Sequence, residues 1–404
     1  MMKYIQYPNN FYTFVETWSA ENEYVLFGSS KECVQFIRTM DHILGSDKLK
    51  IKYIVDHETS QVGVYDNILE LSSSYYYSNV INNSRSNIEV KHLDDYVGKK
   101  DKIIITSDEF RMKYKKYLLK RGYKEDVDFC WYKKISGIWP YVYEKKVHLF
   151  QTDLLVTEKC NLSCTYCNMF MPHYKAPKHT NLDRLLKDID ILFNKVDFIS
   201  TFHLVGGEPF LYPHITEVIE FIGKKYRNKI DKIIITSNGT ISPKDKTIEL
   251  LKKYKVLVAI SDYTDSIEFV GKKVKRIKEI YRQNNIDFYS RKELSWYDFG
   301  DARISNNMTT EELIKHFDSC TAPFRGLYDG KFYFCHLNTS SVLAEIHPEN
   351  ENDFVYLDKV SSEDLIKFDL GYTDLGYVTF CNNCNGCNTG IKIPVTPKKQ
   401  GLRI

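Results

Sequence analysis

Short apolar runs alternate with amphipathic stretches in the first third of the chain. A buried strand is expected at 23–28 (EYVLFG), a helix at 33–44 and a second strand at 50–55. Residues 102–106 (KIIIT) and 108–119 repeat the order of strand and then helix. This order is typical of a parallel sheet that is covered by helices.

The same alternation restarts in the middle of the chain and continues longer. Strands are expected at 147–156, 201–205, 232–236, 256–260 and 286–289, separated by helices at 182–195, 214–226, 244–254 and 266–283. Such a repeat predicts an all-parallel sheet that curls into an open barrel. Its ligands should lie at the carboxyl ends of the strands.

Two interruptions divide the chain. The alternation of strands and helices restarts after Ser136–Pro140, and from about Met308 it stops and Gly, Asn and Cys dominate. We therefore expect three domains: a Rossmann-like α/β domain over 1–145, a partial barrel over 146–307, and a small irregular cysteine-rich domain over 308–404.

The amino-acid composition limits the classes of molecule that the protein is expected to bind. The 404 residues carry 56 Lys and Arg against 53 Asp and Glu, a net charge of +3, so no strongly basic face is expected and nucleic acid is not the default partner. The first residues lack the pattern of a signal peptide, and no run of apolar residues is long enough to span a membrane. We expect an untargeted cytoplasmic protein.

The ten cysteines are unevenly distributed. Cys33 and Cys130 stand alone and are expected to be buried packing residues. The others form a group of three (Cys160, Cys164, Cys167) and a group of five (Cys320, Cys335, Cys381, Cys384, Cys387). Thiols at such short spacings in a reducing compartment indicate metal or iron–sulfur ligands rather than disulfides.

The first group lies on one loop, Cys160-Asn-Leu-Ser-Cys164-Thr-Tyr-Cys167, directly after a predicted strand. A structural zinc site needs four protein ligands, whereas a [4Fe–4S] cluster held by three cysteines leaves one iron open. The motif resembles that of the radical S-adenosylmethionine superfamily, which has an aromatic residue before the last cysteine. Tyr166 occupies this position.

The resemblance extends to the ends of the next strands. Gly206-Gly207-Glu208-Pro209 is similar to the glycine-rich motif of the superfamily that binds the methionine moiety. Thr236-Ser237-Asn238-Gly239 and Ser261-Asp262-Tyr263 match later positions that contact the cofactor. The contacts with S-adenosylmethionine that the resemblance implies are Tyr166, Gly206, Gly207, Glu208, Pro209, Ser237, Asn238, Ser261 and Asp262.

The resemblance also implies a mechanism and a fold. The cluster accepts an electron from a donor such as flavodoxin or ferredoxin and cleaves S-adenosylmethionine, and the resulting 5′-deoxyadenosyl radical abstracts a hydrogen atom from the substrate. The implied fold is a partial (β/α)6 barrel of the TIM type. Little chain separates Tyr289 from Cys320, so we expect the sixth strand to be shortened or supplied by the tail.

The second group begins with Cys320, Gly330 and Cys335, which predict a hairpin that presents a thiol. This spacing resembles the auxiliary-cluster domains of the superfamily, the SPASM and the shorter twitch types. The resemblance implies one auxiliary [4Fe–4S] cluster. Its candidate ligands are Cys320, Cys335, Cys381, Cys384 and Cys387.

Five thiols exceed the four ligand positions of such a cluster. A structural zinc site is an alternative for this group, since pairs of cysteines at short spacing also suit a closed tetrahedral site. A spare thiol, with Cys387 as the candidate, is an alternative catalytic group that would return a hydrogen atom to the substrate radical.

Two further segments carry candidate chemistry. Arg291, Glu293, Tyr297 and Asp298 are the candidate substrate contacts, while the alternative is a solvated loop with Trp296 packed on the core. In the N-terminal domain, residues 28–33 end a strand and open a helix, and Asp56 ends the next strand. Nucleotide binding there competes with a plain packing or substrate-presenting role.

For the whole chain we expect a radical enzyme that oxidises or epimerises a small polar metabolite, such as a carbohydrate or sugar nucleotide. The first alternative is the maturation of a ribosomally made peptide. We rank this alternative second because peptide-modifying relatives often carry a winged-helix domain, whereas the N-terminal region of this chain alternates strands and helices. The remote alternative is a non-catalytic iron–sulfur scaffold.

Overall fold

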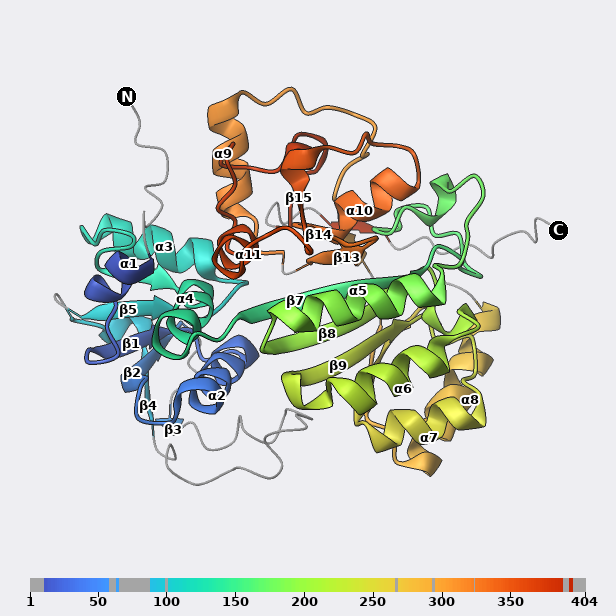
Figure 1. Ribbon diagram of the computed structural model, residues 1–404. Helices are drawn as coiled ribbons and strands as arrows, with labels where there is room; N and C mark the ends of the chain where they lie inside the picture. Colours follow the sequence, from blue (N-terminus) through green and yellow to red (C-terminus); the bar gives the residue numbers. More distant parts are fainter. Residues whose placement is uncertain are drawn as a thin grey trace. The chain divides into compact units, whose positions relative to one another are not determined.

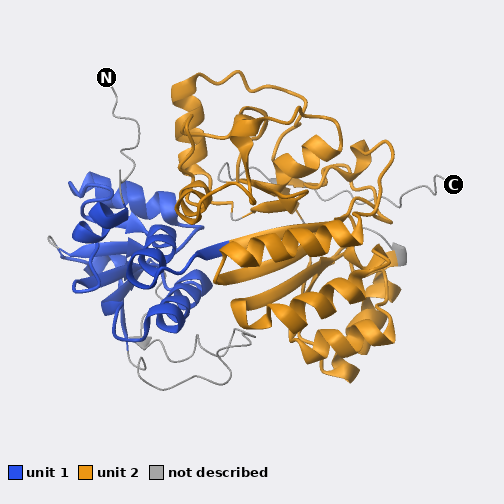
Figure 2. Ribbon diagram, viewed as in Figure 1, with its two compact units in different colours: residues 1–150 blue, residues 151–404 orange. Residues whose placement is uncertain are grey.

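The computed structural model describes residues 11–57, 63–64, 88–98, 101–265, 268–292, 295–322, 324–387 and 392–394. The chain divides into two compact units, residues 1–150 and 151–404 (Figure 2). Each unit combines helices with a sheet of mainly parallel strands, so the α/β class is confirmed. Among the described residues, no helix is long and apolar enough to cross a membrane.

Unit 1 contains one mixed sheet with helices on both faces (Figure 1). Its elements are α1 (Phe11–Thr17), β1 (Glu23–Phe27), α2 (Lys31–Leu44), β2 (Lys50–Asp56), β3 (Gly63–Val64), β4 (Glu89–His92), β5 (Lys102–Ile105), α3 (Arg111–Lys120), β6 (Phe129–Trp131) and α4 (Tyr132–Glu144). The strand order is β3-β4-β2-β1-β5-β6, and only β3 runs antiparallel to its neighbour.

The central strands of unit 1 are apolar on both faces, as expected for buried parallel strands. Phe27 of β1 meets Tyr114 of α3 edge to face, with ring centroids 5.6 Å apart. On the other face, Tyr24 contacts Trp139 of α4 at 5.8 Å. Three layers therefore form because each strand alternates its side chains between two helical layers.

The segment Ser136–Pro140, after which the alternation restarts, lies inside α4. Proline has no backbone N–H, so Pro140 cannot donate the helical hydrogen bond to the carbonyl of Ser136. The buried ring of His148 takes its place, with Nδ1 2.7 Å from that oxygen. A contact from outside the helix thus compensates for the proline.

Replacing His148 by phenylalanine is expected to lower the free energy of unfolding by about 1–3 kcal/mol, because the buried Ser136 carbonyl loses its donor. In a Pro140→Ala background, the new alanine would supply the missing N–H, so the same substitution should cost much less. Urea denaturation of the four proteins in this double-mutant cycle measures the coupling. An equal cost in both backgrounds would refute the compensation.

Unit 2 is built around an eight-stranded sheet of order β11-β10-β9-β8-β7-β13-β14-β15. The first half of its elements is β7 (His148–Thr157), α5 (Leu182–Lys195), β8 (Phe198–Gly206), α6 (Ile215–Lys225), β9 (Ile230–Ser237), α7 (Asp245–Lys253), β10 (Val256–Asp262), α8 (Glu268–Asn284) and β11 (Phe288–Lys292). Strands β8 to β11 run parallel, and α5 and α6 lie over the same face of the sheet (Figure 1).

The segment after residue 308 is more regular than the irregular domain that we expect. It contains α9 (Thr310–Ser319), β13 (Gly326–Tyr328), β14 (Lys331–Tyr333), α10 (His336–Leu343), β15 (Phe354–Tyr356) and α11 (Ser362–Asp369). Strand β13 pairs in parallel with β7, and β14 and β15 extend the sheet from it. These strands have only three residues each, so their sequences carry no periodic signal.

No strand continues the sheet beyond β11 among the described residues. The next strand, β12 (Ser295–Tyr297), pairs instead with β16 (Lys392–Pro394) in a separate antiparallel sheet of two strands. The tail therefore supplies the partner of β12, in a sheet separate from the eight-stranded one.

A buried carboxylate fastens the β13–β14 turn to α5. Oδ1 of Asp188 accepts the backbone N–H of Gly330 at 2.9 Å and lies 2.9 Å from Nε of Arg184. Burial raises the pKa of Asp188 to about 6, although Arg184 and the Gly330 N–H act in the opposite direction. The protonated form of this carboxyl is thus favoured by folding.

The stability of the protein is expected to fall as the pH rises from about 4 to about 6, because the folded state holds the Asp188 proton more tightly than the unfolded state. The slope from this group is at most about 1.4 kcal/mol per pH unit. Asp188→Asn should flatten the slope measured by urea denaturation. The control is Asp183→Asn, which changes an exposed carboxylate on the same helix, and an identical flattening there would contradict the assignment.

Candidate functional site

The first cysteine group lies on the loop that follows β7. The sulfur of Cys160 accepts the N–H of Leu162 at 3.4 Å and lies 3.8 Å from the side-chain nitrogen of Asn238. The sulfur of Cys167 accepts the backbone N–H groups of Met171, Met169 and Phe170. N–H groups aimed at sulfur stabilise negative charge on it, which suits thiolate ligands.

Burial raises the pKa of the Cys160 and Cys167 thiols, and the carboxyl of Glu208 adds to the effect at Cys160. Without a positive charge nearby, both groups would therefore stay protonated at neutral pH. A bound metal reverses this preference, because a coordinating thiol loses its proton. The feature of the loop that suits thiolate ligands is therefore the set of N–H groups directed at the two sulfurs.

Gly206 and Gly207 hold this loop against the end of β8. The Gly207 N–H donates to the Thr157 carbonyl, and the Glu208 N–H donates to the Lys159 carbonyl, each at 2.8 Å. A Cβ added to Gly206 would lie 2.4 Å from the Thr157 oxygen, and one added to Gly207 would lie 2.2 Å from the Lys159 oxygen. The two glycines are therefore required for the close approach of two backbones.

Glu208 ties the glycine motif to the end of β9. Its carboxylate accepts the Ser237 hydroxyl at 2.9 Å, the Asn238 N–H at 2.8 Å and the Phe210 N–H at 3.2 Å. Complete burial raises the pKa of Glu208 to about 7, against the effect of these hydrogen bonds. The side chain connects two strand ends and is not directed to solvent.

A chain of amides continues from Glu208 to the cysteine loop. Asn238 donates to the side-chain oxygen of Asn161 at 2.9 Å, and Asn161 donates to the hydroxyl of Thr240 at 2.7 Å. Sequence reasoning missed Asn161 and Thr240. Asn161 lies between the first two cysteines, so its place in the motif was the available signal.

The remaining predicted cofactor contacts lie in different settings. Asp262 is buried, and its carboxylate accepts a hydrogen bond from Nζ of Lys278 at 2.6 Å. This bond and those from Thr264 outweigh burial and lower the pKa of Asp262 to about 2. Ser261 lies beside it on β10, opposite Arg291 of β11. Tyr166 is 53% exposed, and Pro209 is buried at the start of a short 3-10 helix.

The second cysteine group is assembled from distant segments. Cys320 ends α9, Cys335 precedes α10, and Cys381 lies in the 3-10 helix η8 (Thr379–Asn383). The Cys384 sulfur accepts the N–H of Gly386 at 3.3 Å, and the sulfur of Cys387 lies 3.9 Å from that of Cys320.

Asp353 connects two parts of this group. Its fully buried carboxylate accepts the side-chain N–H of Asn338 at 2.8 Å, the Thr379 hydroxyl at 2.8 Å and the Phe380 N–H at 3.2 Å. Asn338 lies on α10, which begins directly after Cys335, and Phe380 comes directly before Cys381. Asp353 thus holds the segments of these two cysteines together. Sequence reasoning missed Asp353, because nothing near it in the sequence indicates its partners.

One apolar cluster of unit 2 includes members of both cysteine groups. Cys384 is a buried member of this cluster, as are Leu155 and Val205, and Cys160, Cys167 and Cys335 pack against it. Both groups therefore border one apolar cluster of unit 2. No three His, Cys, Asp or Glu side chains within the described ranges converge on a single ion position.

The candidate substrate segment lies beside the second cysteine group. The carbonyl of Phe299, next to Asp298, accepts the N–H of Asn385 at 3.0 Å. Tyr297 is 41% exposed, and Trp296 packs on Tyr263 with ring centroids 5.9 Å apart. Arg291 is exposed on β11, and Glu293 lies outside the described residues.

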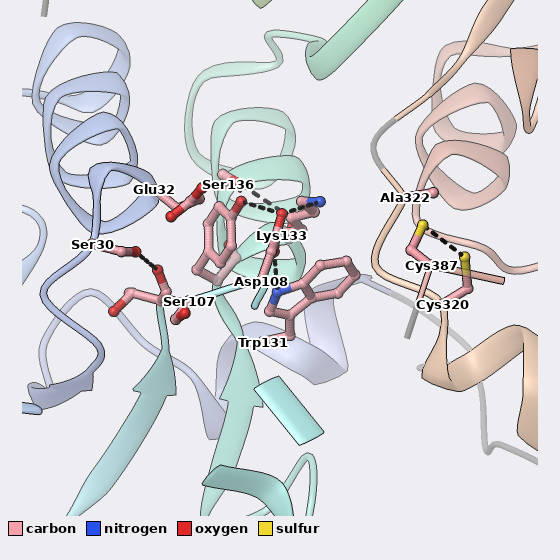
Figure 3. A network of polar contacts seen from close by, with 12 residues as sticks. Ser30, Glu32, Ser107, Asp108, Trp131, Lys133, Ser136, Cys320, Ala322 and Cys387 are labelled. Atoms are coloured by element: carbon pink, nitrogen blue, oxygen red, sulfur yellow. Dashed lines mark hydrogen bonds and ion pairs between the residues drawn. The ribbon is translucent and has the colours of Figure 1, made fainter. Parts of the chain in front are cut away.

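In unit 1, the strand ends are held by internal polar contacts. Asp56 accepts the N–H and the hydroxyl of Ser29 at 2.6 and 2.7 Å. Asp108 accepts Nε1 of Trp131 at 3.1 Å and Nζ of Lys133 at 3.0 Å (Figure 3). A Cβ on Gly28, whose φ is +108°, would lie 2.8 Å from Cβ of Ser107, so this glycine permits close packing of two loops. Cys33 and Cys130 are buried, as expected.

Residues 154–301 match the family described as the Radical SAM superfamily. A similar curated protein is the antilisterial bacteriocin subtilosin biosynthesis protein AlbA of Bacillus subtilis, with 30% identity over 112 residues, which are 28% of this chain and 23% of AlbA. Another is the radical SAM cyclopropyl synthase TigE of Paramaledivibacter caminithermalis, with 29% identity over 177 residues, 36% of each chain. The matches thus span roughly a quarter to a third of these relatives.

Among solved structures, native anSMEcpe with bound AdoMet aligns over 59% of this chain and 89% of its own, at 15% identity and a TM-score of 0.39. The family match begins within β7, ends between β12 and α9, and includes the first cysteine group and the strand ends around Glu208. This chain therefore carries, at residues 154–301, a radical SAM domain of a superfamily of enzymes that use a [4Fe–4S] cluster and S-adenosylmethionine.

Proposed function

We propose that the protein is a radical S-adenosylmethionine enzyme that abstracts a hydrogen atom from a small polar substrate and thereby oxidises or epimerises it. The observation that carries this proposal is the fixed placement of the Cys160 loop by Gly206, Gly207 and Glu208. A loop held by backbone contacts on two sides keeps a cluster in one orientation.

Cys160, Cys164 and Cys167 would hold the first cluster. When bound, that cluster supplies the electron that cleaves S-adenosylmethionine to methionine and a 5′-deoxyadenosyl radical. Asn238 and Leu162 direct N–H groups at the Cys160 sulfur, which favours its thiolate. The apolar residues around the cysteines exclude water and competing hydrogen donors.

A polar substrate is favoured by buried polar groups on the inner face of the sheet. Asp153 and Leu155 of β7 lie on one face, and Leu155 belongs to the apolar cluster around the cysteines. The buried Asp153 binds Nδ1 of His336, and His203 lies 3.4 Å from it. Nε2 of His336 is buried and has no hydrogen-bond partner among the described residues. A hydroxyl or amine of a substrate would satisfy it.

For the other parts of the chain we propose the finer assignments that the patterns predict. Residues 1–145 would be a Rossmann-like domain with a packing or substrate-presenting role, since both carboxylate oxygens of Asp56 already accept hydrogen bonds within the unit. Residues 146–307 would be a partial barrel, and residues 308–404 a twitch-like domain that binds one auxiliary [4Fe–4S] cluster. A flavodoxin or ferredoxin would deliver the electron.

The second candidate function is the modification of a ribosomally made peptide. It is favoured by the similarity to AlbA, which is named for the biosynthesis of the bacteriocin subtilosin. The two candidates differ in what residues 1–145 bind. Micromolar binding of a leader peptide by the full chain, lost when this region is altered, would favour the peptide.

The test is the production of 5′-deoxyadenosine by the reconstituted, reduced full chain. We expect S-adenosylmethionine to be cleaved, and deuterium to enter 5′-deoxyadenosine from one member of a panel of perdeuterated monosaccharides and sugar nucleotides. Transfer from a deuterated peptide instead would support the second candidate. A cluster-loaded protein that forms no 5′-deoxyadenosine would refute both and support an iron–sulfur scaffold.

A further inference from the structure

Three polar side chains close a hydrogen-bonded ring beside Cys160. Nδ2 of Asn238 donates to Oδ1 of Asn161 at 2.9 Å, and Nδ2 of Asn161 donates to Oγ1 of Thr240 at 2.7 Å. The Thr240 hydroxyl in turn donates to Oδ1 of Asn238 at 2.5 Å. Asn161 directly follows Cys160, and Asn238 directly follows the last residue of β9. The ring therefore joins the loop of the first cysteine group to the end of β9.

One backbone group fixes the direction of every bond in this ring. The N–H of Thr240 meets the side chain of Asn238 at 3.0 Å, and because an N–H only donates, the atom that it meets is the amide oxygen. The amide nitrogen of Asn238 therefore faces Asn161 and Cys160. Its partner in Asn161 must then be an oxygen, so the amide nitrogen of Asn161 faces the hydroxyl of Thr240.

The protein uses every hydrogen-bonding position of the Asn238 side chain. A primary amide has two protons and two lone pairs. Oδ1 accepts both the N–H and the hydroxyl of Thr240. One proton of Nδ2 goes to Asn161, and the other is directed at Sγ of Cys160, 3.8 Å from the nitrogen. This buried side chain therefore has no position left with which to bind a cofactor.

We propose that Asn238 is a positioning residue that acts through Cys160 and not on S-adenosylmethionine, and that its N–H raises the reduction potential of the first cluster. The inference rests on the proposed function, which supplies that cluster. It differs from the contact with S-adenosylmethionine that the sequence pattern implies for Asn238. Hydrogen bonds to ligand sulfurs stabilise the additional negative charge of the reduced state. The ring keeps the amide in the orientation that directs its N–H at the sulfur.

Two other roles for Asn238 compete with this one. A ring that only holds the cysteine loop to β9 would affect the stability and the iron content, but not the midpoint potential of a loaded cluster. A direct contact between Asn238 and the cofactor would instead make its removal raise the KM for S-adenosylmethionine. The midpoint potential, the iron content and the KM therefore separate the three roles.

The experiment compares four variants of the full chain, reconstituted without oxygen. Asn238→Leu removes the amide. Thr240→Val opens the ring and keeps the shape of the side chain, whereas Thr240→Ser keeps the hydroxyl. The matched control is Thr247→Val, which removes another buried hydroxyl, 2.7 Å from that of Thr216, between α6 and α7.

Iron and sulfide are measured for each protein, and the midpoint potential is followed by electron paramagnetic resonance during a redox titration. The signal of the first cluster is the one that is missing from the Cys160→Ala protein. The KM for S-adenosylmethionine is obtained from the rate of 5′-deoxyadenosine formation.

We expect Asn238→Leu to keep the full iron content, to shift the midpoint potential to a more negative value and to leave the KM unchanged. Thr240→Val should shift the potential in the same direction by a smaller amount, because the Thr240 N–H still holds the amide. Thr240→Ser and Thr247→Val should keep the potential of the parent protein.

An unchanged midpoint potential in Asn238→Leu, or a raised KM, would refute the proposal. If Asn238→Leu binds no iron, Thr240→Val decides, and an unchanged potential or a loss of iron there would show that the ring only holds the loop. A parent protein that binds iron in the first group but forms no 5′-deoxyadenosine would refute the proposed function, while the shift in potential would still support the role of Asn238. A parent protein without iron in this group would refute both.

Discussion

Replacing Cys160 by alanine is expected to remove the cluster of the first cysteine group, about four irons per chain, and to abolish the formation of 5′-deoxyadenosine. The cause is the loss of one of three ligands, which cannot be replaced locally because the Cys160 loop is fixed at Thr157 and Lys159. Iron analysis and chromatography of the reaction mixture measure the two effects.

Two controls accompany Cys160→Ala. Cys33→Ala removes a buried thiol of α2 in unit 1 and should change neither the iron content nor the rate of cleavage. Cys320→Ala should lower the iron content by a similar amount but leave the first cluster in place. A Cys160→Ala protein that retains its iron and cleaves S-adenosylmethionine at the normal rate would contradict the assignment of the first group.

Gly207→Ala is expected to lower the rate of S-adenosylmethionine cleavage by roughly 100-fold while all cysteines remain present. The new Cβ would lie 2.2 Å from the Lys159 oxygen and 2.9 Å from Cβ of Cys160. Both belong to the cysteine loop, and the Lys159 oxygen is backbone, so the loop itself must move. A shift of about 1 Å suffices for a loss of this size.

The matched control is Gly122→Ala. Gly122 has φ of +84°, and a Cβ there would meet nothing within 4 Å, so the variant carries only a backbone cost of about 1–2 kcal/mol. Thermal unfolding measures this cost, and the cleavage rate should be unchanged. Equal cleavage rates for the two variants at a temperature where both are folded would show that the glycine contact has no role in positioning the cluster.

The sequence predicts most strongly the elements whose signal is local. Strands β7 to β11 and their helices were expected because apolar residues recur at regular spacing over whole elements. The cysteine loop and the glycine motif were expected because their residues are contiguous. That Gly206 and Gly207 contact the cysteine loop was not expected, since this depends on two chain segments that meet only in the fold.

The missed features depend on contacts between distant residues. The contact of His148 with the Ser136 carbonyl, which compensates for Pro140 inside α4, has no signal in the sequence because it joins two elements. Strand β13 has three residues, and only its pairing with Asp153 and Leu154 of β7 makes it part of the sheet. Asp353 is one acidic residue among many in the sequence. Its role is to join two distant segments, because its carboxylate accepts hydrogen bonds from the side chains of Asn338 and Thr379.

The pairing of β7 with β13 bears on how the protein can be dissected. With β13 in place, β7 has a neighbour on both sides, β8 and β13. A protein cut after residue 307 would leave the backbone groups of Asp153 and Leu154 without β13 and expose an apolar edge strand, a template for aggregation. The radical SAM domain of this chain is therefore not an independent module, because its first strand needs the cysteine-rich tail as a neighbour.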